Sequence, residues 1–281
     1  YQVEQDLIQL AVQEGLAELR ALAEEDPTHH RGWLVLGREA RIEGRLTESK
    51  DALDRALEVV DKDSPADQAE THFQRYLLFK EMGHLDDAMA AWEEAVKHDP
   101  TRANTMRDLY TALTDAGRYG DALRYVQRDT NSMCAGLQRG LIAHMTGKPI
   151  EAREQWQAVA ALDPEEYATG QECWVESVLR LGDSERAIDA LSRLLRSFRT
   201  PRLLVLSGIA WAMQGEAELA STLFQQALTS MRRRRPPKQK LDGSDWRLLD
   251  SLASDDEVKK ALKPYFAVIE TVWAKPASYP G

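Results

Sequence analysis

GWLVLGREARIEGRLTESKDALDRALEVV, residues 32–60, contains two amphipathic segments separated by a glycine at position 44. Trp33 lies in the first segment, and the small Ser49 and the bulky Leu53 lie one turn apart in the second. Residues spaced in this way share one face of a helix. Gly44 suits the end of a helix because it has no Cβ and tolerates the left-handed conformation. The stretch therefore predicts a helical hairpin.

The same pattern recurs along the chain at a nearly constant interval. Glycines separated by 39, 34, 30, 35 and 33 residues occupy the turn position: Gly44, Gly83, Gly117, Gly147, Gly182 and Gly215. A small residue follows each glycine after five positions, and a bulky apolar residue follows four positions later. A period of about 34 residues accommodates two short helices and two turns, which is typical of an array of helical hairpins. The sequence therefore predicts an all-α solenoid.

The repeated unit resembles the tetratricopeptide repeat, whose pattern runs through an aromatic residue, Leu-Gly, Ala, a bulky apolar residue, Ala and Pro. The resemblance is strongest in residues 32–60 and in HLDDAMAAWEEAVKHDP, residues 84–100. Units three and five depart from it, for example at Asp129 and Val175. The resemblance implies a right-handed α-solenoid of about six hairpins over residues 28–235.

Both ends of the chain differ from this pattern. Residues 1–27 are predicted to form an N-terminal helix, either a cap or a truncated repeat, that closes at Asp26-Pro27. Residues 236–281 are predicted to form a linker followed by C-terminal capping helices. We expect these helices to cover the last repeat, because the outermost repeat of a solenoid needs a cap with a polar outer face.

Composition limits the classes of partner. A net charge of −10 argues against general nucleic-acid binding. The basic run from Arg232 to Lys240 could hold an acidic protein, a nucleic acid or anionic lipid. The favoured alternative is that its cations neutralise a helix C-terminus and solvate a linker, because the run lacks aromatic residues that could stack on bases. No apolar segment of about 18 residues is present, so the given chain is not expected to span a membrane.

The cellular compartment stays open between cytoplasm and bacterial periplasm. Since the chain starts at Tyr1 and not at methionine, we expect an incomplete N-terminus, from which a signal peptide, an anchor or earlier repeats were removed. Cys134 and Cys173 fall near the starts of neighbouring units, where a disulfide is conceivable, but isolated thiols are favoured. The 25 arginines against 11 lysines suggest a bacterial coding bias.

No sequence motif indicates a catalytic activity. The sequence contains no glycine-rich phosphate loop, no His-Glu-x-x-His, no Cys-x-x-Cys and no Gly-x-Ser-x-Gly elbow. The six histidines are scattered, and the adjacent His29 and His30 are interpreted as solvated turn residues rather than metal ligands. We therefore expect no enzyme activity, no cofactor and no metal.

In the family that the chain resembles, the first helices of successive units line a concave groove that binds peptides or partner helices. Carried onto this sequence, the groove positions of units one and two include Arg31, Leu34, Val35, Arg38, Arg41, Phe73, Gln74 and Leu77. Later units add Asn104, Arg107, Asp108, Thr111, Leu137, Gln138, Leu141, His144, Glu172, Glu176, Arg180, Arg202, Val205 and Leu206. Of these, Leu34, Phe73, Leu77, Leu137 and Leu141 are predicted apolar anchors.

An arginine stripe crosses the first unit. Arg31, Arg38 and Arg45 are seven residues apart, with Arg41 between them, so their guanidinium groups could fork onto carboxylates of a partner. The equally weighted alternative is that Glu39, Glu43 and Glu48 neutralise the stripe locally. The lysine and asparagine set with which some family members hold a C-terminal carboxylate is missing, so a chaperone-tail receptor is not expected.

These patterns predict a non-enzymatic interaction module, a scaffold or adaptor that docks a segment of a partner protein in its groove. Two alternatives stay open. The chain could be the docking or regulatory part of a larger enzyme or envelope assembly, or it could be a self-assembling structural protein.

Overall fold

In the computed structural model, the described residues are 15–167 and 169–232. They form α-helices, two short 3₁₀ segments and turns, with no β-strand among them. The prediction of an all-α fold is thereby confirmed. The described residues divide into two compact units, unit 1 up to Thr105 and unit 2 from Met106.

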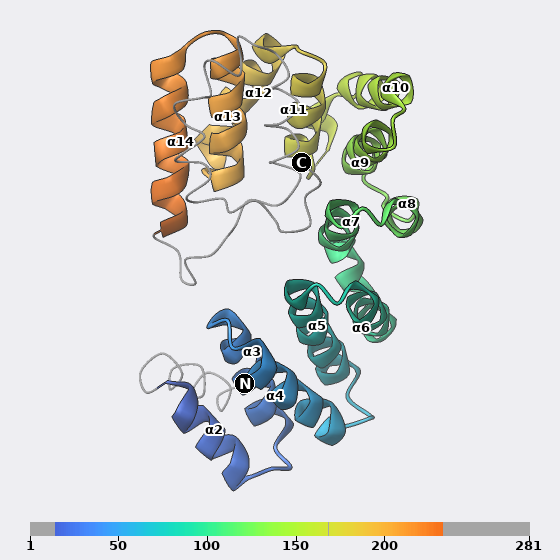
Figure 1. Cartoon of the computed structure of the whole chain (residues 1–281), viewed down its shortest axis with the longest axis vertical. Helices are drawn as coiled ribbons and strands as arrows, with labels where there is room; N and C mark the ends of the chain where they lie inside the picture. The colour runs from blue at the N-terminus through green and yellow to red at the C-terminus, as the bar shows by residue number, and fades with distance from the viewer. Residues whose placement is uncertain (1–14, 168, 233–281) are drawn as a thin grey trace. The chain divides into compact units, whose positions relative to one another are not determined.

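Unit 1 consists of two helical hairpins preceded by a single helix (Figure 1). Its elements are α2 (Leu16–Glu25), α3 (His30–Ile42), α4 (Leu46–Val59), α5 (Pro65–Met82), α6 (Leu85–His98) and the 3₁₀ segment η1 (Pro100–Thr105). Helix α2 ends at the predicted Asp26-Pro27 boundary and packs on α3, as the second helix of a preceding unit would.

Unit 2 contains four further hairpins. Its elements are α7 (Met106–Asp115), α8 (Tyr119–Val126), α9 (Ser132–Met145), α10 (Pro149–Ala160), η2 (Pro164–Glu166), α11 (Gln171–Arg180), α12 (Ser184–Ser197), α13 (Pro201–Met213) and α14 (Ala217–Arg232). The two units together therefore show the six hairpins that the period predicts within the described residues. The residues predicted to form the C-terminal caps, and the start of the N-terminal helix, lie outside the described residues.

The repeated glycines make the turn inside each hairpin. All six have φ between 73° and 87°, the left-handed region that a side chain disfavours. At the α5–α6 turn the backbone N–H groups of Gly83 and His84 donate to carbonyls of the last turn of α5. These bonds satisfy groups that a helix end leaves without partners. The sequence period thus marks the hairpin turns.

The small and bulky positions of the second helices form the interior of each hairpin. Ala88 and Trp92 of α6 are fully buried, and Ser49 of α4 donates its hydroxyl to the carbonyl of Gly37 at 2.7 Å. Glycines on the first helix let the bulky residue approach. A Cβ added at Gly140 would lie 2.3 Å from Nε1 of Trp156.

This close approach predicts opposite effects for two glycine substitutions in unit 2. Gly140→Ala should lower the free energy of unfolding by about 1–3 kcal/mol, because overpacking outweighs the higher helix propensity of alanine. Gly120→Ala is the matched control, since an added Cβ there meets nothing within 4 Å. It should raise stability by up to about 1 kcal/mol. Urea denaturation followed by circular dichroism measures both changes, and equal effects at the two sites would contradict the packing argument.

The structure corrects one expectation about the cysteines. Cys134 of α9 and Cys173 of α11 form a disulfide with a Cα–Cα distance of 5.1 Å, so they are not isolated thiols. The side chain of Asn131 accepts from the backbone N–H of Cys134 and donates to the carbonyl of Thr169, at 3.1 and 2.9 Å. The disulfide and this asparagine therefore join the starts of two successive first helices.

No helix among the residues that the structure describes has the length and apolar character needed to cross a membrane.

Candidate functional site

The first helices of unit 1 carry eight of the predicted groove residues, and the structure pairs their arginines with carboxylates. Arg31 lies 3.4 Å from Asp67, Arg38 lies 3.0 Å from Glu39, and Arg41 lies 2.5 Å from Glu81. Two of these carboxylates belong to the next first helix, α5. The structure therefore favours the alternative in which carboxylates of the chain itself neutralise the arginines. Two of these carboxylates, Asp67 and Glu81, were not indicated by helix spacing.

The predicted groove residues of α5 differ in exposure. Phe73 and Leu77 are half-buried, whereas Gln74 is only 6% exposed. The guanidinium of Arg102 lies 4.6 Å from the centroid of the Phe73 ring, and it also pairs with Glu70. The aromatic ring of Phe73 therefore packs against a cation on one face.

Two buried polar atoms in this region have no hydrogen-bond partner. They are Nε of Arg41 and Oε1 of Gln74, and no other buried side-chain nitrogen or oxygen of the described residues lacks a partner. Both belong to residues that the sequence placed in the groove. A buried polar group without a partner is unfavourable and rare in folded proteins.

Other predicted anchors lie in the core of the chain itself. Leu34 is 6% exposed, Leu137 is 4% exposed and Leu141 is 1% exposed. Burial leaves these three leucines little surface for a partner, so the proposals below do not use them. Asn104 is exposed in η1, and Arg107 of α7 pairs with Glu172 of α11 at 2.7 Å.

Unit 2 contains a buried ionic cluster at three predicted groove positions. Glu176 of α11 is fully buried and accepts from Nε and Nη2 of Arg180 at 3.0 and 2.7 Å. Its second carboxylate oxygen accepts from Arg202 of α13 at 2.6 Å. The Arg180 guanidinium also lies 5.4 Å from the centroid of the Trp156 ring. This cluster joins two successive first helices, so the structure gives it a packing role within unit 2.

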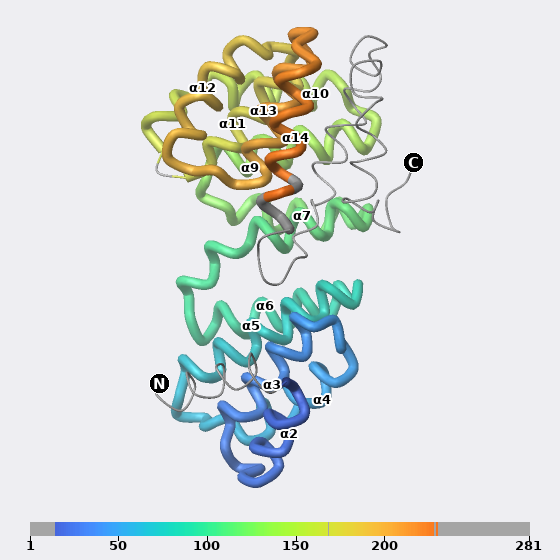
Figure 2. Tube along the Cα trace, turned by 90° about the vertical axis from the view of Figure 1, so that its left-hand side faces the viewer, coloured from blue at the N-terminus to red at the C-terminus, as the bar shows by residue number. Residues whose placement is uncertain are grey.

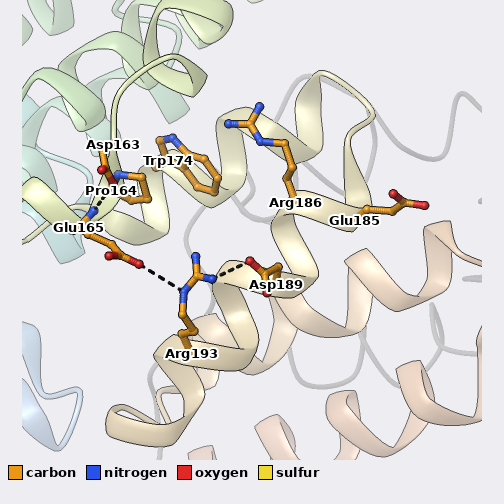
Figure 3. A pocket seen from close by; sticks show the side chains of 8 residues that line it. All are labelled: Asp163, Pro164, Glu165, Trp174, Glu185, Arg186, Asp189 and Arg193. Atoms are coloured by element: carbon orange, nitrogen blue, oxygen red, sulfur yellow. Dashed lines mark hydrogen bonds and ion pairs between the residues drawn. The ribbon is translucent and has the colours of Figure 1, made fainter.

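A surface hollow of about 440 Å³ lies beside α11 and α12 (Figure 3). Arg193 lies between Glu165 and Asp189, at 3.7 and 2.6 Å. The Arg186 guanidinium lies 5.1 Å from the centroid of the Trp174 ring and donates to the carbonyl of Ala160. These charged groups pair with one another or with the backbone, and their arrangement nominates no general acid, base or nucleophile.

Three side chains of the α5–α6 hairpin form a cluster that the sequence analysis missed. His72 of α5 and His98 of α6 stack with ring centroids 6.0 Å apart, and Glu94 lies one helical turn before His98. Burial, together with the nearby Arg75 guanidinium, lowers the pKa of His72. The four-residue spacing of Glu94 and His98 was a visible signal, but the sequence did not show that His72 faces them.

A family model described as tetratricopeptide repeat matches residues 174–238. No curated protein sequence matches the chain. One similar solved structure is a tetratricopeptide repeat protein from Parabacteroides merdae, with a TM-score of 0.54 and 18% identity. Its alignment covers 89% of this chain and 99% of that one.

Two other solved structures are less similar. The pilF protein of Pseudomonas aeruginosa has a TM-score of 0.41 and 17% identity, over 83% of this chain and 99% of that one. A chain of the APC/C Cut9–Hcn1 hetero-tetramer has a TM-score of 0.48 and 16% identity, over 91% of this chain and 48% of that one. At these identities, structural similarity shows the fold alone. The structure that supports the fold is that of the Parabacteroides protein, with its TM-score of 0.54. Residues 174–238 match the tetratricopeptide repeat model, and the six helical hairpins of the described residues share the fold of the Parabacteroides repeat protein.

Proposed function

We propose that this chain is a non-enzymatic adaptor that docks a segment of a partner protein on the first-helix face of unit 1. The tetratricopeptide repeat fold generally serves protein interaction, and proteins of this family are typically scaffolds without enzyme activity. The observation that carries the proposal is that Phe73 and Leu77, one helical turn apart on α5, both keep part of their apolar surface exposed.

Affinity would come chiefly from apolar contact. Phe73 and Leu77 lie one helical turn apart on α5 and are both half-buried, so a partner side chain can cover the surface that remains. The arginines of α3 are paired within the chain, and an acidic partner would have to displace those carboxylates. We therefore propose a partner segment that carries an apolar residue and is not strongly acidic.

Site-specific photo-crosslinking tests the proposal. A photoreactive amino acid at position 77 of the full chain, expressed in cells of the source organism, should crosslink a protein through one defined segment. The same group at Leu22 of α2 is the matched control, since Leu22 is an exposed apolar residue on a different helix. A synthetic peptide of the crosslinked segment then allows affinity to be measured.

Phe73→Ala should weaken binding of that peptide by at least about tenfold, because loss of an aromatic anchor commonly costs more than 1.4 kcal/mol. Leu77→Ala should also weaken it, whereas Leu22→Ala should leave affinity unchanged. Equal crosslinking from positions 77 and 22, or unchanged affinity in both α5 variants, would place the partner elsewhere. Light scattering over a concentration series would separate that outcome from self-association.

A further inference from the structure

The open end of the α5–α6 hairpin brings three metal-binding side chains together. Each of His72, Glu94 and His98 has one possible ligand atom, and these three atoms all lie within 4.8 Å of one another. The imidazole rings of His72 and His98 are nearly parallel, with an interplanar angle of 3°. All three residues are half-buried, so a small ion can reach them from solvent while the helices restrict their movement.

We propose that His72, Glu94 and His98 form a binding site for one divalent transition-metal ion of the Zn²⁺ class. Two imidazole nitrogens and one carboxylate oxygen are a donor set that zinc accepts, with water as a fourth ligand. Softer metal ions prefer thiolate ligands, whereas Ca²⁺ and Mg²⁺ prefer oxygen ligands alone. The proposed site is independent of the proposed docking function, since it does not use the residues assigned to the partner.

The required rearrangement is small. Zinc–nitrogen distances of about 2.0–2.1 Å place tetrahedral ligand atoms roughly 3.3 Å from one another. Since the three atoms already lie within 4.8 Å, rotation of the side chains can close the remaining gap of about 1.5 Å. The backbone does not need to move. Neighbouring residues of both helices, Tyr76 on α5 and Trp92 and Ala95 on α6, are fully buried and hold the hairpin together.

One competing interaction must give way. Nζ of Lys97 lies 2.9 Å from Oε2 of Glu94, and Nε2 of His98 lies 3.8 Å from the same oxygen. The Lys97 side chain is 66% exposed, so it can turn into solvent when an ion binds. Because exposed ion pairs contribute little, Lys97 is a weak competitor for the carboxylate.

The position of the site gives it a structural consequence. Helices α5 and α6 form one hairpin (Figure 1 and Figure 2), whose turn lies at Gly83. By their positions in the two helices, the three ligands lie toward the opposite end of the hairpin. An ion bound there would link the two helices at the end that the chain does not connect. Since the ligands come together only in the folded hairpin, metal binding should stabilise the folded state.

Calorimetric titration of the full chain with Zn²⁺ tests the proposal. We expect one ion per chain, and a melting temperature that rises with Zn²⁺ concentration. His98→Gln and Glu94→Gln should each weaken binding by at least about tenfold, since even residues outside the ligand shell commonly alter metal affinity by 10–100-fold. The spectrum of the Co²⁺-substituted chain should show the strong visible absorption of four-coordinate cobalt.

His84→Gln is the matched control, because His84 lies at the opposite end of the same hairpin and stacks on Phe79. It should bind Zn²⁺ like the unchanged chain. If His72→Gln disturbs folding, as circular dichroism without metal would show, His98→Gln and Glu94→Gln still decide the question. Unchanged Zn²⁺ affinity in those two variants, or equal loss in His84→Gln, would overturn the proposal.

Discussion

Glu176→Gln is expected to lower the free energy of unfolding of unit 2 by about 3–5 kcal/mol. The Glu176 side chain is fully buried, and that of its partner Arg180 is 1% exposed. Removing the negative charge would take away the carboxylate that the buried Arg180 shares with the partly exposed Arg202. A buried charge that loses its partner is among the few single changes with so large an effect.

The glutamine cannot replace the carboxylate at both contacts. Its oxygen could accept from one arginine, but its NH₂ group would then face the N–H groups of the other. Donors would oppose donors at a side chain that is fully buried. Urea denaturation measures the change in stability. Hydrogen exchange should show lost protection in α11 and α13 before other helices, because repeats interact mainly with their neighbours.

Glu172→Gln is the matched control on the same helix. Glu172 also pairs with an arginine, but its side chain is 31% exposed and that of Arg107 is 36% exposed. Solvent screens such a pair, so the loss should not exceed about 1 kcal/mol. Similar effects of the two substitutions would contradict the assignment of the large effect to burial of the charge.

The sequence predicted the fold well because the hairpin is specified locally. A glycine such as Gly83 ends a helix through its own backbone conformation, and Ala88 and Trp92 share a buried face through helix geometry alone. These signals need no knowledge of distant residues. Repetition at one period then makes the pattern specific.

The candidate site was less predictable because exposure depends on neighbouring repeats. The resemblance to the family places Glu176 and Leu141 at groove positions, yet both are buried by packing that the period does not describe. Helix spacing correctly suggested Glu39 and Glu48, which pair with Arg38 and Arg45, but it did not indicate Glu81 of the next first helix, which pairs with Arg41. Contacts between residues far apart in the sequence decide these outcomes, and a single sequence does not reveal them.

The cysteine pair also depends on contacts between residues far apart in the sequence. Its reduction is the second change for which we expect a large loss of stability. Each lies on its own helix, 39 residues from the other, and only the packing of α9 against α11 brings them together. A disulfide that closes a loop of this length restricts the unfolded chain, which corresponds to about 4 kcal/mol in the chain-entropy description. Reduction of unit 2 should therefore cause a loss of stability close to that of Glu176→Gln.

Melting curves with and without dithiothreitol measure this contribution. The reductant should lower the melting temperature of the unchanged chain and leave that of a Cys134→Ala/Cys173→Ala variant unaffected. Equal melting of the unchanged chain in both conditions, with two thiols that react with an alkylating agent under native conditions, would contradict the bond. Thiol trapping in intact cells extends the experiment to the compartment. Since structural disulfides persist in oxidising compartments and are rare in the cytosol, an oxidised Cys134–Cys173 pair would favour the periplasm over the cytoplasm.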